Sequence, residues 1–510
     1  MAASDSGVAD GGETSGVVFP AGADGRRGST DTGRAIFADA LRAASADAAA
    51  ACERERNWRT RYIVHARRAV EEAAQSASAA TAIARAGLRS AHQRLQFVRG
   101  GTSRTLSEAL RETREGFFTH TVTGVSKAGP ASITIPYRGQ LLGGDALRRQ
   151  LDRWEADGII EPSFAQALWR VQAHPEWLDL SDQRFVLLGA QAEMAPLPWL
   201  LRWRARVYAI DLPRAAIWQQ IIRLAHAGNG TLHVPCAADL GDSADSARLA
   251  SHAGADLIDD TPEIAAWLAP IEGPLTVGAY AYLDGAQHVR VSAAMDAIQA
   301  ALASQRKDVT LAMLATPTDA YGVSTAALSM AHERFAARGW AARAARAVTL
   351  GRTFARNGAA LPAGAAATSE SIGGIVDTLV VEQGPNYALA KRLQHWRALA
   401  AREQGTRVSI HVAPPALTGS VLRNKLIAAA YRAAYRFGAQ AFEPATAAAL
   451  MAALLVHDLR YADAPANPHV PLAHPLQLLN EAACHGGLWR MPYSARSALP
   501  VAAAIGMLQS

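Results

Sequence analysis

The chain has 510 residues, half of them hydrophobic, and a net charge of +6. This length is sufficient for a large buried core and for more than one domain. The 51 basic residues are almost all Arg and form no basic block, since only Lys127, Lys307, Lys391 and Lys425 are Lys. The charge pattern therefore argues against a dedicated nucleic-acid surface and supports only a modest attraction for anionic ligands.

The cysteine content and the lengths of the apolar runs indicate in which cellular compartment the protein resides. The three cysteines, Cys52, Cys236 and Cys484, are odd in number and far apart, which favours a reducing environment over a disulfide framework. The first residues contain Asp and Gly in place of the basic and apolar runs of a signal peptide. The longest apolar stretch, 445–456, is too short to span a bilayer. We therefore expect a cytoplasmic protein with no integral membrane segment.

The first third of the chain differs from the rest in composition and in the spacing of its apolar residues. Residues 1–30 are rich in Gly, Ala, Asp and Ser, which predicts a disordered tail. Residues 31–180 are expected to be mostly helical, because apolar residues recur at spacings of three and four. Two short strands, at 117–125 and 131–137, are predicted within this region, joined by a Gly/Pro connection. Residues 144–175 predict two short helices.

From residue 182 onward, short apolar runs alternate with helical patterns. The expected strands are 184–190, 206–212, 230–235, 274–285, 308–317 and 407–415. This alternation predicts a parallel sheet with helices on both faces. We therefore expect an α/β fold with a Rossmann-like doubly wound sheet over 181–465. An insertion at about 319–383 would hold a helix and a long loop, and 466–510 would cover the substrate side.

The first strand of this sheet ends in LLGAQAEM, with Gly189 and Ala190 at the turn toward a helix. In doubly wound sheets a phosphate group binds at this position. Asp211 ends the second strand, where an acidic side chain accepts a hydrogen bond from ribose and repels a 2′-phosphate. Met194 and Pro196 occupy positions where further glycines are usual. Without a cofactor, Gly189 would serve a tight turn and Asp211 would cap a helix.

A chain that almost always uses Arg places a Lys four residues after Tyr387, at Lys391. On a helix the two side chains share one face, one turn apart. A neighbouring ammonium stabilises a phenolate and lowers the pKa of the Tyr, which then suits general acid–base chemistry. The alternative is a Tyr packed on a helix surface with a Lys that reaches water.

With these residues and the later VAPPALTGS, the sequence resembles the short-chain dehydrogenase/reductase superfamily over about 182–460. The resemblance implies an NAD(P)-dependent oxidoreductase, with NAD preferred, that acts on a carbonyl or alcohol of a small molecule. Tyr387 would be the general acid/base, and Lys391 would lower its pKa and hold the ribose. The residues expected to bind the dinucleotide are Gly189, Ala190, Asp211, Lys391, Pro414 and Thr418.

The family also places a Ser at the end of the fifth strand, shortly before the Tyr, to polarise the substrate carbonyl. Here that strand ends in LATPTDAYG, so Thr316 and Thr318 are the expected hydroxyl donors, provided that the insertion loops out and returns. Ser369 and Ser371 are alternatives nearer the Tyr. Tyr321 competes with Tyr387, but no Lys follows it at the required spacing.

Other functions remain open at this stage. A non-catalytic Rossmann-like nucleotide-binding or scaffold protein would explain the degenerate glycine turn, and a methyltransferase would also use a Gly turn and an acidic second strand. His469, His474, Cys484 and His485 are spaced too loosely for a typical zinc site, so we expect no metal. The N-terminal helices would pack on the sheet or on a second copy of the chain, which leaves a homo-oligomer open.

Overall fold

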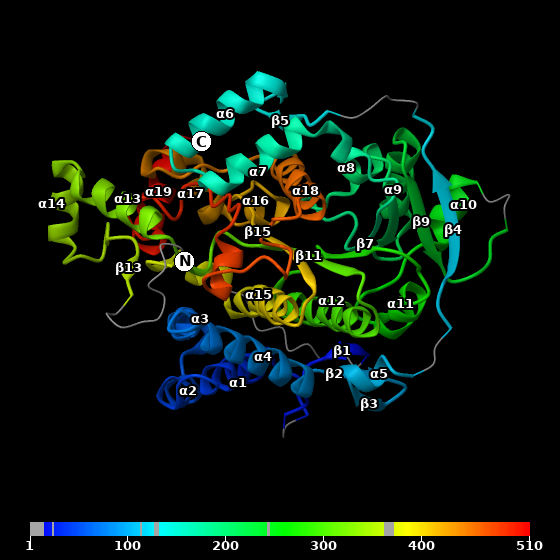
Figure 1. Ribbon diagram of the computed structural model, residues 1–510. Coiled ribbons are helices and arrows are strands. Elements are labelled where there is room, and N and C mark those ends of the chain that lie inside the picture. Colours follow the sequence, from blue (N-terminus) through cyan, green and yellow to red (C-terminus); the bar gives the residue numbers. More distant parts are fainter. Residues whose placement is uncertain are drawn as a thin grey trace.

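A computed structural model describes residues 15–22, 25–112, 115–126, 132–241, 245–361 and 372–509. Its centre is a seven-stranded sheet in the order β15–β11–β10–β7–β8–β9–β4 (Figure 1). The strands are β4 (Phe118–Thr123), β7 (Arg184–Leu188), β8 (Arg206–Ile210), β9 (Thr231–Cys236), β10 (Leu275–Ala279), β11 (Val309–Ala315) and β15 (Arg407–Val412). All neighbours are parallel except β4, which is antiparallel to β9. The predicted α/β fold with a Rossmann-like sheet is confirmed.

Strand order reverses in the middle of this sheet. From β7, the chain moves outward through β8 and β9 on one side, and then returns to add β10, β11 and β15 on the other. The loops that follow β7 and β10 therefore diverge to opposite faces. In open α/β sheets, the crevice between such loops is the usual ligand site.

Two cores form on the two faces of the sheet, because successive strand side chains point to opposite sides. On β7, Val186 and Leu188 join one core while Phe185 and Leu187 join the other. The first core contains α11 (Thr261–Leu268), α12 (Gly285–Gln305) and α15 (Pro385–Glu403). The second contains α6 (Gly144–Ala156), α7 (Pro162–Ala173), α8 (Leu197–Arg202), α9 (Ala215–Ala227), α10 (Ser246–His252) and α18 (Pro444–Arg460).

The N-terminal region forms a further layer over α12 and α15 (Figure 1). It comprises β1 (Gly16–Val18), α1 (Ser29–Arg42), α2 (Ala46–Glu53), α3 (Trp58–Ala73), α4 (Ala77–Arg94), β2 (Gln96–Arg99), β3 (Thr102–Thr105) and α5 (Leu106–Ala109). The prediction of a disordered tail over 1–30 is wrong for β1, because Val17 and Val18 are buried and pair with β2. Residues 1–14 and 23–24 lie outside the described part.

Two strands predicted in this region pair differently from expectation. The segment expected at 117–125 is β4, which extends the main sheet beside β9. The segment expected at 131–137 yields β5 (Ile135–Tyr137), which pairs with β6 (Gln140–Leu142). Sequence pattern identified both strands but not their partners, because β9 lies far along the chain from β4, whereas β6 follows β5 immediately after the turn. The two helices expected over 144–175 are α6 and α7, followed by η1 (Pro175–Leu178).

The insertion after β11 is more regular than the expected helix and long loop. Its elements are β12 (Ala320–Val323), α13 (Thr325–Ala336), α14 (Trp340–Val348), β13 (Ala359–Ala360), β14 (Gly374–Asp377) and η2 (Val381–Gln383). Antiparallel pairing sets Ala320 opposite Asp377. The chain therefore leaves the end of β11 through β12 and returns to the same point through β14.

The C-terminal part follows β15. It contains α16 (Gly419–Arg423), α17 (Lys425–Ala433), η3 (Ala434–Phe437), α18, η4 (Pro475–Leu479) and α19 (Ala495–Leu508). Helix α19 packs along α17. In the described ranges, no helix combines the length and apolarity needed to cross a membrane.

Helix α15 meets the N-terminal layer at a close contact. A Cβ built on Gly87 of α4 would lie well inside van der Waals distance of the Trp396 ring of α15. Phe37 of α1 packs against the same ring at 5.8 Å between centroids. Beside them, the buried carboxylate of Asp296 on α12 accepts hydrogen bonds from Arg397 at 2.7 and 2.8 Å. These contacts fix α15 between the sheet and the N-terminal helices.

We expect Gly87→Ala to lower the free energy of unfolding by about 1–3 kcal/mol, because the methyl group overpacks the contact with Trp396. Gly33→Ala is the matched control, since a Cβ there makes only ordinary contacts, at 3.6 Å or more. Removing a glycine from that helix interior should stabilise by about 0.5–1 kcal/mol. Urea denaturation of both variants measures the difference, and equal effects of the two substitutions would contradict the assignment of Gly87 to a tight interface.

Candidate functional site

A cavity of about 720 Å³ opens at the carboxyl ends of the central strands, where strand order reverses. Gln191 and Glu193 line it from the loop after β7, and Tyr282 and Asp284 from the loop after β10. Thr316 and Thr318 follow β11, Pro414 and Thr418 follow β15, and Tyr387 and Lys391 come from α15. Six of the residues predicted to act in catalysis or cofactor binding therefore line one cavity: Thr316, Thr318, Tyr387, Lys391, Pro414 and Thr418.

Tyr387 lies in the first turn of α15. The helix begins at Pro385, which is favoured at this position because its missing N–H has no helical partner. Thr316, which is far from Tyr387 in sequence, lines the same cavity. Burial raises the pKa of Tyr387 to about 12, and the neighbouring Thr316 side chain opposes that rise. The phenol is thus held protonated at neutral pH, beside a second hydroxyl.

Lys391 lies one turn further along α15. Its Nζ donates to the Leu314 carbonyl oxygen at 3.3 Å and to Gln394 Oε1 at 3.1 Å. Burial lowers the pKa of Lys391 to about 8. The expected effect of this ammonium on Tyr387 is not found, because burial dominates and moves the pKa of the Tyr upward. Lys391 instead contributes a positive charge whose burial is energetically unfavourable.

A histidine that sequence reasoning missed packs against this pair. The ring of His288 on α12 stacks on that of Tyr387, with centroids 5.6 Å apart. Its Nδ1 faces the backbone N–H of Leu283 at 3.4 Å. Burial and the nearby charge of Lys391 hold the pKa of His288 well below its usual range, so the ring is neutral. No motif signalled His288, because its role depends on a contact between two helices.

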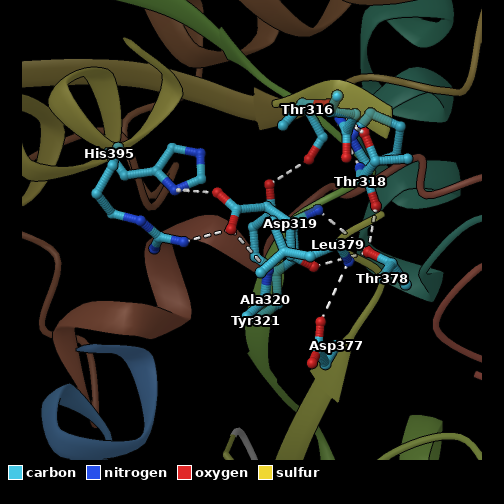
Figure 2. A network of polar contacts seen from close by, with 12 residues as sticks. Thr316, Thr318, Asp319, Ala320, Tyr321, Asp377, Thr378, Leu379 and His395 are labelled. Carbon is cyan, nitrogen blue, oxygen red and sulfur yellow. Dashed lines mark hydrogen bonds and ion pairs between the residues drawn. The ribbon is translucent and has the colours of Figure 1, made fainter. Parts of the chain in front are cut away.

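Thr316 and Thr318 are held by the return of the insertion (Figure 2). Their hydroxyl oxygens lie 3.0 Å apart, and Gln383 Nε2 donates to that of Thr318. Thr378, which directly follows β14, donates through its hydroxyl to the carbonyls of Pro317 and Asp319, each at 2.7 Å. The Tyr321 hydroxyl donates to the Thr316 carbonyl. Tyr321 is therefore a buried support for the turn.

A buried ion pair anchors this turn from below (Figure 2). Asp319 is 1% exposed and pairs with Arg392 of α15, and its Oδ1 also accepts from the backbone of Ala320 at 2.7 Å. His395 Nδ1 lies 3.8 Å from Asp319 Oδ2. Since Arg392 directly follows Lys391, the ion pair ties this part of α15 to the threonine turn.

The glycine turn after β7 has a structural reason for its sequence. Gly189 has φ +90°, and a Cβ there would lie 2.5 Å from the Ala281 backbone. The N–H groups of Gly189 and Ala190 both donate to the Ile210 carbonyl. The Asp211 carboxylate accepts from the backbone of Gln191 at 2.8 Å and of Leu212 at 2.9 Å. Gly189, Ala190 and Asp211 thus build the turn behind the cavity wall, which begins at Gln191.

Two polar contacts connect the segment after β15 to the loops on either side of the crevice. Glu193 accepts from the backbone N–H of Gly419 through Oε1 at 3.1 Å and Oε2 at 3.0 Å. On the other side, Arg423 pairs with Asp284 at 2.9 Å. We call residues 418–424 the strap. Sequence reasoning noted Met194 and Pro196 in the glycine turn but missed Glu193, whose partner follows more than two hundred residues later.

The remaining candidates are placed elsewhere. Ser369 and Ser371 lie outside the described residues. Cys484 is a buried free thiol, while His485 bonds to Glu161 at 2.9 Å and His474 Nδ1 accepts from Leu476 at 3.1 Å. Across the described ranges, no group of three or more His, Cys, Asp or Glu side chains is arranged to hold a metal ion.

Comparison with known proteins provides no relative for this arrangement. No protein-family model matches the chain, and neither a curated protein nor a solved structure matches it. The geometry of the cavity is therefore the guide to what the protein binds.

The lowered pKa of Lys391 predicts a pH-dependent cost of folding. The folded pKa of about 8 lies below the unfolded value, about 10.4. Between these values the unfolded state binds more protons, so this group makes the free energy of unfolding rise with pH. Relative to Lys391→Met, we expect the parent to gain about 3 kcal/mol between pH 7 and pH 10.5.

Urea denaturation at a series of pH values measures this difference. Lys307→Met is the control, because Lys307 is exposed and lies outside the cavity. Its stability should track that of the parent at every pH. If the Lys391→Met curve also runs parallel to the parent, the ammonium is not buried as described.

Proposed function

We propose that the chain is an NAD(P)-dependent oxidoreductase of short-chain dehydrogenase/reductase type that acts on a carbonyl or alcohol. The observation that supports this most is that Tyr387, Thr316 and Lys391 line one cavity. A phenol, a hydroxyl and an ammonium from two distant segments meet at the reversal of strand order. That is the constellation which the family resemblance requires, with Thr in place of Ser.

Each residue then has a definite role. Thr316 donates a hydrogen bond to the substrate oxygen, and Thr318 orients the Thr316 hydroxyl through their 3.0 Å contact. Tyr387 gives its hydroxyl proton to that oxygen as a hydride reaches the carbon, so the C=O double bond becomes C–H and O–H. The resulting phenolate recovers a proton from water. The raised pKa of Tyr387 favours this reductive direction, because the donor form prevails at neutral pH.

A nicotinamide dinucleotide would supply the hydride, and the cavity fits it better at one end than at the other. Lys391, Pro414 and Thr418 would hold the nicotinamide end. Asp211 holds the turn behind the cavity wall, so its carboxylate does not select between NAD and NADP. At the pyrophosphate end, Glu193 brings a carboxylate where negative charge is expected to bind.

This carboxylate favours a second candidate, a non-catalytic Rossmann-like nucleotide-binding or scaffold protein. In that case the bond between Glu193 and Gly419 would be a permanent brace of the strap. The presence of Tyr387, Thr316 and Lys391 in one cavity would then have no chemical purpose, which is why we rank this candidate second.

Cofactor binding and Tyr387→Phe together test the proposed function. NAD at a hundred times its dissociation constant should add about 2.7 kcal/mol to stability, whereas S-adenosylmethionine should add nothing. Tyr387→Phe should keep that NAD shift but lose turnover of a panel of aldehydes and ketones by about 10²–10⁴-fold, because it removes the proton donor. The thermal shift and the consumption of reduced nicotinamide measure the two effects.

Tyr435→Phe is the matched control, since Tyr435 is exposed and lies outside the cavity. Its turnover should equal that of the parent. Parental turnover in Tyr387→Phe would overturn the assigned role. NAD binding without any turnover in the parent would favour the non-catalytic candidate, and a shift with S-adenosylmethionine alone would favour a methyltransferase.

Glu193→Gln tests how the cavity accepts a pyrophosphate. Removing the like charge should tighten NAD binding about fivefold, as expected for a partly exposed charge pair. The gain should shrink at high salt, because screening weakens the repulsion in the parent. Isothermal titration at two salt concentrations measures it, with Glu176→Gln, an exposed carboxylate outside the cavity, as the control. Weaker NAD binding by Glu193→Gln would show that the brace is needed for the site.

A further inference from the structure

The cavity extends well beyond the residues assigned to the reaction. Its far wall comes from α17, η3, the segment around Leu488 and Met491, and α19. We call this the C-terminal wall. Its lining residues include Ile427, Tyr431, Phe437, Met491, Ala498 and Leu499. Most of them also belong to a separate apolar core formed by the C-terminal helices or pack against it.

Charge is distributed unevenly around the cavity. The charged lining residues are Glu193, Asp284, Glu382, Lys391 and Arg423, all at the crevice or on the strap. Among the described residues, no lining residue of the C-terminal wall is charged. Its hydroxyl comes from Tyr431, which is near enough to Tyr387 for the two phenols to interact electrostatically. The cavity is thus polar where the hydroxyls meet and apolar beyond Tyr431.

Small residues on α19 explain why this wall encloses space. Near its C-terminal end, Gly506 brings α19 into backbone contact with Ala429 of α17, so no room remains there. Arg432 Nε donates to the Gly506 carbonyl at 3.2 Å and locks this contact. Earlier in α19, Ala495, Ala498 and Ala502 face the cavity and fill little of it. The two helices pack along each other, and we call the part of the cavity that both of them line the arm.

We propose that the C-terminal wall binds the apolar part of the substrate, an alkyl chain or hydrocarbon skeleton that bears the reacting carbonyl or alcohol. This inference rests on the proposed function for the position of the reacting oxygen, between Thr316 and Tyr387. The hydrocarbon then extends past Tyr431 into the arm, the part of the cavity that α17 and α19 line. A charged or strongly polar tail is rejected, because the wall offers it no partners and its desolvation is unfavourable.

Binding of straight-chain primary alcohols from butanol to decanol tests the proposal without any turnover. Each methylene that enters the arm should tighten binding about fourfold, as measured by isothermal titration. The gain should end at the chain length that fills the arm. Affinity that does not change with chain length in the parent would overturn the proposal.

Substitutions on α19 locate the binding surface. Ala498→Trp fills the arm and should remove most of the dependence on chain length. Ala504→Trp is the matched control, because Ala504 is exposed on the same helix, and it should behave as the parent. Should Ala498→Trp not fold, Leu499→Ala provides the test, since the enlarged arm should move the optimum to longer alcohols. An unchanged optimum in Leu499→Ala would place the alcohols elsewhere and overturn the proposal.

Failure of this inference is distinguishable from failure of the proposed function. Dependence on chain length without an NAD shift or turnover would support the apolar arm and overturn the oxidoreductase. An NAD shift with turnover that requires Tyr387, but with equal affinity for all chain lengths, would support the oxidoreductase and overturn the arm.

Discussion

The site depends on the antiparallel pairing of β12 with β14. This pairing returns the chain to the end of β11 after an excursion of more than fifty residues, with Ala320 opposite Asp377. Thr378 then bonds to the backbone of Pro317 and Asp319, and α15 begins shortly afterwards, beyond η2. Thr316 and Tyr387 can line the same cavity only because the register of this small sheet is fixed. Cross-strand pairing thus replaces the short connection that the family resemblance implies.

The two ends of the cavity carry charges of opposite sign. At the hydroxyl end, burial keeps Tyr387 protonated while Lys391 retains its charge against a lowered pKa. At the strap, Glu193 and Asp284 present carboxylates that backbone and Arg partners already engage. A dinucleotide would be attracted by the charge of Lys391 at the hydroxyl end. At the strap, the carboxylates would repel its phosphates. Because the strap joins both sides of the crevice, any ligand that spans it must displace or fit beneath these contacts.

Local patterns in the sequence predicted the layered fold well, because buried strands and amphipathic helices leave short-range signals. Local patterns also placed Tyr387 and Lys391 on one helix and Thr316 at the end of a strand, and all three line one cavity. Pairings over long distances left no such signal. The partner of β4, the burial of Val17 and the contact of Glu193 with Gly419 all depend on residues far apart in the sequence. Asp211 illustrates a third case, since its position was right but its carboxylate holds the turn.

The layer of N-terminal helices over α15 has a consequence during synthesis. Helices α1, α3 and α4 leave the ribosome long before α15, whose Trp396 fills the space left by Gly87. At about 5–20 residues per second, translation takes on the order of 15–60 seconds to proceed from one to the other. During that interval the face of these helices that packs on α15 has no native partner in the nascent chain. This topology therefore leaves that face exposed to other contacts while the rest of the chain is made.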